Sequence, residues 1–173
     1  MPDWSAPHLV GTLVTLRRYQ PDDAAALWEM VNEPEGAMLT ATTDTFTKPQ
    51  IEDWVVKVAH AHDRLDLVVV ENATGEYAGE VVFNAYVPEQ ASINFRIALR
   101  GPAWWGRGLG SEATDLMCEY GFSHLALRRI TLDVLATNVR ARRVYEKSGF
   151  RVVREYTEDS LEWVHMQRKR DSA

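Results

Sequence analysis

Trp104-Trp105-Gly106-Arg107-Gly108-Leu109-Gly110-Ser111-Glu112-Ala113 is the stretch that decides the fold. Three glycines stand at alternate positions in it, after the alternating apolar run Ile93 to Leu99 and before an amphipathic helical pattern. Glycine allows positive φ and lets another group approach the main chain closely. The first N–H groups of the following helix have no partners and concentrate partial positive charge. The stretch therefore predicts a site for a phosphate or pyrophosphate group.

The composition is that of an ordinary globular domain. The chain has 173 residues, of which 46% are hydrophobic and 25% charged, and this suits one domain over residues 1–173. A net charge of −6 argues against binding to nucleic acid, which requires a basic face, and favours a cationic partner. The start of the chain lacks a signal-peptide pattern, and no run approaches the roughly 18 apolar residues of a membrane helix, so no membrane partner is expected. With Cys118 as the single cysteine, no internal disulfide is possible, and we expect a cytoplasmic protein.

Apolar periodicity predicts an antiparallel meander that runs into a β–α–β unit, all within one α/β domain. The strands are expected at residues 13–18, 67–70, 77–86, 91–99, 129–135, 150–156 and 162–168, and the helices at 24–32, 49–58, 108–125 and 139–147. Glu33-Pro34-Glu35-Gly36 is expected to end the first helix, with a loop from Ala37 to Lys48. Asn138 is expected to cap the last helix, and Gly149 to close it in the left-handed conformation.

One alternative interpretation of the glycine stretch is a dinucleotide site. Gly108 to Ala113 matches the fingerprint Gly-x-Gly-x-x-Ala, and Asp133 follows at about the 20-residue spacing of a ribose-binding acid. That fold needs several β–α units and a strand directly before the glycines, whereas Arg100-Gly101-Pro102-Ala103 intervenes here and only one such unit is predicted. An NAD(P)-binding oxidoreductase is therefore a less favoured alternative. The missing Gly-Lys-Ser/Thr excludes a P-loop NTPase.

A second motif, Asn138-Val139-Arg140-Ala141-Arg142-Arg143-Val144-Tyr145-Glu146-Lys147-Ser148-Gly149-Phe150, follows after a helix and a strand. It resembles the Asn-x-x-Ser/Ala…Tyr-Glu-Lys-x-Gly-Phe block of the GNAT superfamily of acyl-CoA-dependent N-acetyltransferases. Trp105-Gly106-Arg107-Gly108-Leu109-Gly110 is similar to that family's Gln/Arg-x-x-Gly-x-Gly/Ala loop. The opening, Gly11 to Asp23, is similar to the Rim-type branch, which acetylates protein N-termini and assorted small amines.

The resemblance implies the GNAT fold, an α/β (α+β) domain with a mixed, mostly antiparallel twisted sheet of about six to seven strands and about four helices. It also implies direct transfer of an acetyl group from acetyl-CoA to a primary amine, either a protein N-terminus or a small molecule, in a ternary complex. Loop N–H groups would bind the pyrophosphate, a strand end would pair with the pantetheine arm, and an asparagine would bind near the thioester. The residues implied for cofactor binding are Ile97, Ala98, Leu99, Gly106, Arg107, Gly108, Leu109, Gly110, Ser111 and Asn138.

Two residues are implied for catalysis. Tyr145 stands where the family's general acid stands, ready to protonate the departing thiolate. Asp133 occupies a position that holds a carboxylate base in some members, and we expect it to accept the amine's proton. A water-mediated base is the open alternative, in which case Asp133 would be solvated or paired with Arg129 or Arg142.

Some features depart from the family pattern or leave alternatives open. Trp105 replaces the Gln or Arg that heads the loop, and Ser92 stands where many Rim-type sequences carry a Glu. His60 and His62 are two apart and do not share a helix face, so no metal site is expected. A non-catalytic domain that binds acyl-CoA as a sensor or partner module remains a second interpretation. The family's habit of pairing through edge strands would allow a homodimer.

Overall fold

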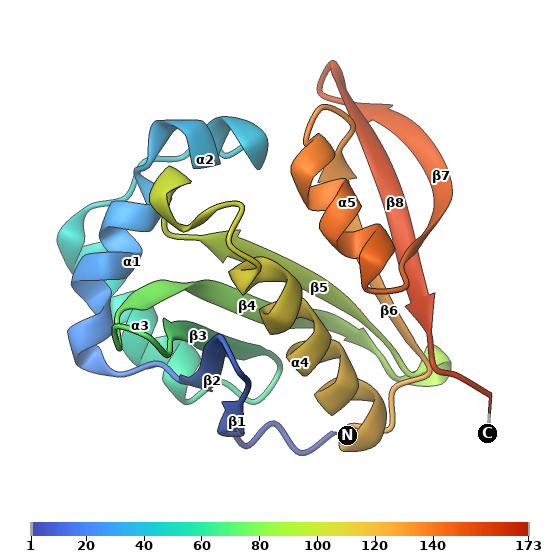
Figure 1. Ribbon diagram of the computed structural model, residues 1–173, viewed down its shortest axis with the longest axis horizontal. Coiled ribbons are helices and arrows are strands. Elements are labelled where there is room, and N and C mark those ends of the chain that lie inside the picture. The colour runs from blue at the N-terminus through green and yellow to red at the C-terminus, as the bar shows by residue number, and fades with distance from the viewer. Residues whose placement is uncertain (1, 173) are drawn as a thin grey trace.

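The computed structural model describes residues 2–172, which form one eight-stranded sheet with helices on both faces (Figure 1). The strand order is β1-β2-β3-β4-β5-β6-β8-β7, and neighbouring strands are antiparallel except for β5 and β6. The strands are β1 (Leu9–Val10), β2 (Val14–Arg18), β3 (Leu65–Glu71), β4 (Tyr77–Val87), β5 (Ser92–Leu99), β6 (Arg129–Leu135), β7 (Arg151–Glu158) and β8 (Leu161–Lys169). The helices are α1 (Ala24–Val31), α2 (Pro34–Leu39), α3 (Lys48–Ala59), α4 (Leu109–Ser123) and α5 (Val139–Lys147). Within this described part of the chain, none of the helices has the length and apolar character needed to cross a bilayer.

The predicted order of elements is confirmed, with one strand and one helix more than expected. The two-residue strand β1 is too short to show an alternating pattern. The expectation that the chain is a loop from Ala37 is wrong, because α2 runs from Pro34 to Leu39. The side chain of Glu33 accepts hydrogen bonds from the N–H groups of Glu35 and Gly36, so it caps a new helix. Pro34, taken from the sequence as a helix terminator, occupies the first turn of that helix, where proline is favoured.

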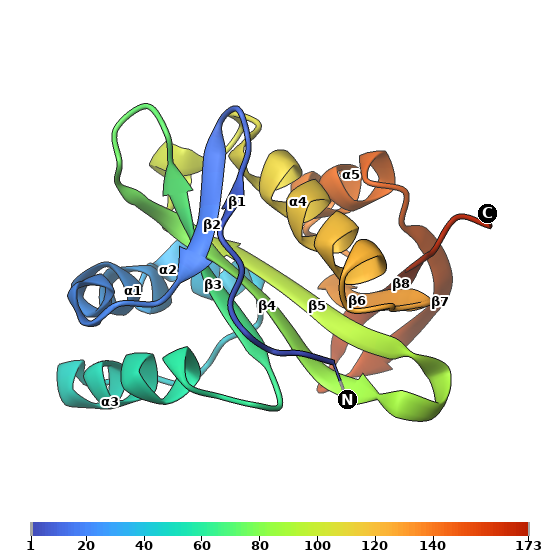
Figure 2. The same cartoon turned by 90° about the horizontal axis from the view of Figure 1, so that it is seen from below.

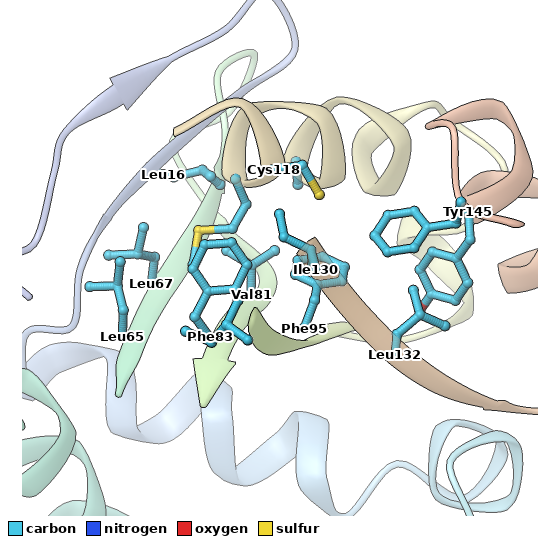
Figure 3. Packing of buried hydrophobic residues seen from close by; sticks show 14 of the residues in the cluster. Leu16, Leu65, Leu67, Val81, Phe83, Phe95, Cys118, Ile130, Leu132 and Tyr145 are labelled. Carbon is cyan, nitrogen blue, oxygen red and sulfur yellow. The ribbon is translucent and has the colours of Figure 1, made fainter. Parts of the chain in front are cut away.

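Helices cover the two faces of the sheet at different strands (Figure 2). On one face, the larger apolar cluster joins the sheet to α4 and α5 and includes Phe95, Met117 and Ile130. Figure 3 shows its buried side chains in a row beneath α4, from Leu16 to Tyr145. On the opposite face, a second cluster packs β3 and β4 against α1 and α3. Strand β3 is thus covered on both sides, as its unbroken apolar run predicts.

The sheet opens between its two central strands. β5 and β6 pair over three residues only, Ser92 with Arg129, Ile93 with Ile130 and Asn94 with Thr131. Beyond them the strands diverge, and β6, β8 and β7 turn away from β5 (Figure 1). Residues 95–99 remain paired with β4, and no strand within residues 2–172 lies on their other side. This single parallel pair also excludes the doubly wound parallel sheet of a dinucleotide-binding fold.

Gly79 keeps the strand with the open edge, β5, close to β4. A Cβ atom on Gly79 would overlap the carbonyl oxygen of Ala98. We therefore expect Gly79→Ala to force β4 and β5 apart and to lower the free energy of unfolding by about 1–3 kcal/mol, as measured by urea denaturation. Gly75→Asn is the control, because Gly75 lies in a turn at φ 73° with nothing near its added Cβ, and asparagine tolerates that conformation. An unchanged unfolding midpoint for Gly79→Ala would contradict this packing.

Candidate active site

The glycine stretch forms a row of free main-chain donors at the start of α4. Gly106 and Gly108 have φ of 70° and 81°, in the left-handed region that glycine adopts without strain. The N–H group of Glu112 is the first to enter the helical pattern, donating to Gly108 at 3.1 Å. Among residues 2–172, no group accepts a hydrogen bond from the N–H groups of Arg107 to Ser111. Free N–H donors at the positive end of a helix dipole are suited to binding an anion.

The side chain of Arg107 anchors this loop to the sheet. Its Nη2 pairs with the buried carboxylate of Glu71 at the end of β3, and its Nη1 donates to the carbonyl oxygen of Ala103 at 3.3 Å. The guanidinium group is therefore committed to holding the loop. Arg107 can contribute to an anion site through its main chain, as the sequence predicts, but its side chain serves the fold.

Glu112 lies in the first turn of α4, and its carboxylate is bound by main-chain groups at the start of β2. Its Oε1 accepts hydrogen bonds from the N–H groups of Leu13 at 2.8 Å and Val14 at 2.9 Å. This carboxylate thus ties the start of β2 to α4.

The open edge of β5 adjoins the donor row. A Cβ atom on Gly110 would lie 3.7 Å from a methyl carbon of Leu99 and 3.9 Å from one of Ile97. Arg100, which follows β5, pairs with Glu29 at 2.6 Å and lies 4.9 Å from the Trp104 ring centroid. The structure therefore brings together the strand end and the glycine loop that the sequence assigns to one cofactor site.

Trp105 lies against α5 rather than offering a polar group to the loop. The guanidinium carbon of Arg140 is 4.7 Å from the Trp105 ring centroid, a cation–π distance. The contact links the loop on the β5 side of the opening to the first turn of α5 on the β6 side. At this position, where the family pattern has a polar side chain, Trp105 thus makes a contact across the opening.

Tyr145 is buried in the wall of the opening. Its ring lies edge-on to Phe95 at 6.4 Å and to Phe150 at 5.9 Å between centroids. Burial raises the pKa of the Tyr145 hydroxyl far above its ordinary value. Among residues 2–172 the hydroxyl has no hydrogen-bond partner. Tyr145 is thus a neutral O–H donor at physiological pH.

Asn138, at the start of α5, contacts the end of α2 across the opening. Its Oδ1 accepts a hydrogen bond from the N–H group of Ala141 at 3.3 Å, which confirms the predicted helix cap. Its Nδ2 donates to the carbonyl oxygen of Leu39 at 3.4 Å, at the end of α2. Both polar atoms of the amide therefore have protein partners, and Asn138 connects α5 to the helix that the sequence missed.

Asp133 lies on the sheet face opposite α4, because Leu132 and Val134 on either side of it belong to the α4 cluster. Its Oδ1 accepts hydrogen bonds from the Tyr156 hydroxyl and from Nδ1 of His165, both at 2.9 Å. Burial, together with the bond to Asp133, raises the pKa of Tyr156 to about 12, so its hydroxyl remains a donor.

The ion pairs considered for Asp133 from the sequence do not form. The side chain of Arg129 bonds to Gln90, and that of Arg142 to the carbonyl oxygen of Ala136. His165 and Tyr156 were not predicted as partners. The alternation in β8 does place His165 on the polar face, between Val164 and Met166, but it cannot show which residue of β6 it faces.

Glu80 is a second acid that sequence reasoning did not single out. It lies in β4 opposite Ala98, is buried, and accepts a hydrogen bond from the Tyr19 hydroxyl at 2.6 Å. The Tyr19 and Tyr77 hydroxyls are 2.7 Å apart. Burial raises the pKa of the Glu80 carboxyl above its ordinary value. The three side chains form a buried polar network beneath α1, on the face that carries Asp133.

A family model described as an acetyltransferase (GNAT) domain matches residues 14–151, and the chain therefore belongs to the GNAT acetyltransferase family. The spermidine N(1)-acetyltransferase of Escherichia coli (strain K12) is 35% identical over 95 residues, which are 54% of this chain and 50% of that protein. The chain thus matches half the length of this curated relative.

Solved structures support the same fold. A GNAT-family acetyltransferase from Bacillus anthracis superposes with a TM-score of 0.83 at 20% identity, covering 94% of this chain and 98% of that one. The spermidine N-acetyltransferase from Vibrio cholerae, in complex with CoA and spermine, gives a TM-score of 0.82 at 20% identity, covering 92% and 96%. At this identity the likeness concerns the fold alone.

We expect the Arg107–Glu71 pair to stabilise the loop measurably. In Arg107→Gln the buried Glu71 carboxylate loses its charged partner and keeps only the hydrogen bond from the Thr74 hydroxyl. The free energy of unfolding therefore falls by about 1–2 kcal/mol, a value reduced because Arg107 is 44% exposed. Urea denaturation of Arg107→Gln, Glu71→Gln and the double variant measures the coupling. Strictly additive losses would contradict the pairing. Arg151→Gln, an exposed change in β7, is the control.

Proposed function

We propose that this protein is an acetyl-CoA-dependent N-acetyltransferase that transfers the acetyl group directly to a primary amine. The observation that supports this best is the row of free N–H groups from Arg107 to Ser111, placed beside the open edge of β5. Coenzyme A has the matching chemistry, because its pyrophosphate is an anion and its pantetheine arm carries amide groups that can pair with a strand. Family membership and a fold neighbour in complex with CoA support the same ligand.

In this proposal the donor lies across the open sheet. The pyrophosphate accepts hydrogen bonds from the main chain of Gly106, Arg107, Gly108, Leu109, Gly110 and Ser111, and the pantetheine arm pairs with Ile97, Ala98 and Leu99. Asn138 caps α5 at the far side of the opening. From that position it contacts the pantetheine arm near the thioester and helps to hold it. The acetyl group then lies where β5 and β6 part.

Tyr145 and Asp133 divide the proton transfers. Tyr145 donates its proton to the departing thiolate, which suits a hydroxyl that burial keeps neutral. Asp133 lies on the face of the sheet opposite α4 and accepts the proton of the amine. Oδ1 of Asp133 is held by two donors, whereas Oδ2 has no hydrogen-bond partner among residues 2–172 and is free to face an amine.

The acceptor is a cationic primary amine in this account. A net charge of −6 and the free oxygen of Asp133 favour a cation. The two spermidine acetyltransferases named above are named for spermidine, and one of them is in complex with spermine, while the Rim-type resemblance adds protein N-termini. Polyamines and peptide N-termini are therefore the two acceptor classes to assay first.

A homodimer and a cytoplasmic location stay predictions. β7 lies at the edge of the sheet and leaves Val152 and Val153 46% and 49% exposed, so it offers an apolar strand for pairing with a second copy. The single cysteine, Cys118, is buried, and such cysteine usage is typical of a reducing compartment.

Tyr145→Phe tests the catalytic part of the proposal. Removing the acid should lower kcat about 100-fold or more, while acetyl-CoA still raises the melting temperature as it does for the parent protein. Tyr120→Phe, which changes a half-buried tyrosine on α4 stacked on His124, is the matched control. Initial rates with acetyl-CoA are measured on spermidine, spermine and a short peptide with a free N-terminus.

The outcomes separate the competing interpretations. Stabilisation by acetyl-CoA without turnover of any amine would favour the non-catalytic acyl-CoA-binding module. Stabilisation by NADH alone would overturn the acetyltransferase proposal. Unchanged turnover in Tyr145→Phe would remove this hydroxyl from the mechanism.

A further inference from the structure

We propose that His165 is a positioning residue whose charge controls the affinity of the Asp133 carboxylate for a cationic amine. The inference rests on the proposed function, because it concerns the acceptor side of the same site. Asp133 and His165 are direct partners in the β6–β8 ladder, and their side chains meet at 2.9 Å between Oδ1 and Nδ1. The structure thus places an ionisable ring against the carboxylate expected to meet the amine.

The position of Asp133 relative to the opening gives the pair its importance. Thr131 is the last residue of β6 that pairs with β5, and Asp133 follows two residues later on the same face. Asp133 therefore borders the opening, and His165 lies one strand further out on β8. An amine that attacks a thioester in the opening meets Asp133 first, and His165 acts on it only through Asp133.

The two donors to Asp133 also fix which oxygen stays available. Tyr156 and His165 both donate hydrogen bonds to Oδ1, so they hold the carboxylate in one orientation. Oδ2 then remains available to a ligand. Tyr156 is itself held by the stacked ring of Trp163, with centroids 6.5 Å apart and planes within 12° of each other. Asp133 is 36% and His165 22% exposed, so the pair is accessible to a ligand and to protons from solvent.

His165 is the member of this cluster whose residue type changes charge between pH 5 and 8. From β7 the cluster is faced by Tyr156, whose raised pKa of about 12 keeps it neutral, and by two charged side chains. The guanidinium of Arg154 lies 4.7 Å from the Tyr156 ring, and the carboxylate of Glu158 is close enough to help raise the pKa of Tyr156. From β6 it is faced by Asp133. On β8 itself the neighbours on the same face, Trp163 and Gln167, carry no charge.

The sign of the effect follows from the charges. Neutral His165 leaves the full negative charge of Asp133 for an ammonium group. Imidazolium at 2.9 Å cancels most of that charge, so a cationic amine binds more weakly at acidic pH. The hydrogen bond to Oδ1 persists in both states if Nδ1 carries a proton, so protonation changes the charge of the site and leaves its geometry in place.

The experiment compares the KM for the amine at pH 5.5 and at pH 8 in the parent protein and in His165→Asn. The asparagine amide occupies nearly the place of Nδ1 and can still donate to Asp133, but it does not titrate. With the fastest acceptor among spermidine, spermine and the peptide, we expect the parent KM to be about tenfold higher at pH 5.5. In His165→Asn the two KM values should agree within about twofold, with kcat at pH 8 retained.

Two further variants serve as controls. Tyr156→Phe removes the other donor without changing charge, so it should keep the parent's pH dependence of KM. His60→Gln changes a histidine at the end of α3, where its Nδ1 is 3.0 Å from the Val56 carbonyl oxygen, and should leave both KM values as they are.

Each outcome decides the inference. A parent-like tenfold change in His165→Asn would overturn it, because the charge would then come from elsewhere. Loss of turnover at pH 8 in a folded His165→Asn would also overturn it, since His165 would then take part in the chemistry itself. If the parent protein acetylates no amine, the proposed function fails and this inference fails with it, whereas a flat KM in a parent that turns over rejects the inference alone.

Discussion

The short parallel pairing of β5 with β6 is the constraint on which the rest of the structure depends. Three residue pairs join the two halves of the sheet. Beyond Asn94 and Thr131 the two halves diverge. The apolar cluster packs against the α4 side of the sheet, on both halves of the split. Because of this split, the end of β5 has main-chain groups with no pairing strand in the described part of the chain, and the glycine loop at its end faces the same opening.

The sequence predicted those parts of the fold that depend on local patterns. β6 was expected at the residues where it occurs, and the Asn138 cap and the left-handed Gly149, at φ 89°, are present because each depends on a few adjacent residues. The helix α2 was missed because Pro34 both ends one helix and begins another, and the capping carboxylate of Glu33 determines the outcome. Propensity alone does not distinguish these two uses of proline.

The sequence predicted which residues form the candidate site, but not which side chains those residues contact. Asp133 could be placed on the polar face of its strand, yet its bond to His165 depends on the register of β6 against β8, which an intervening helix and strand determine. The pairing of Arg107 with Glu71 likewise joins residues 36 apart, because the folded chain brings the glycine loop to the end of β3. Such contacts follow from tertiary geometry, and no local pattern of residue types records them.

Amide hydrogen exchange with and without CoA tests most directly whether the open edge of β5 and the glycine loop are the cofactor site. The account predicts that saturating CoA slows exchange of the amides in residues 95–99 and 107–111, because these groups gain hydrogen-bond acceptors, while β1 and β7 at the sheet edges change little. Binding of CoA that leaves the exchange of both segments unchanged would contradict it.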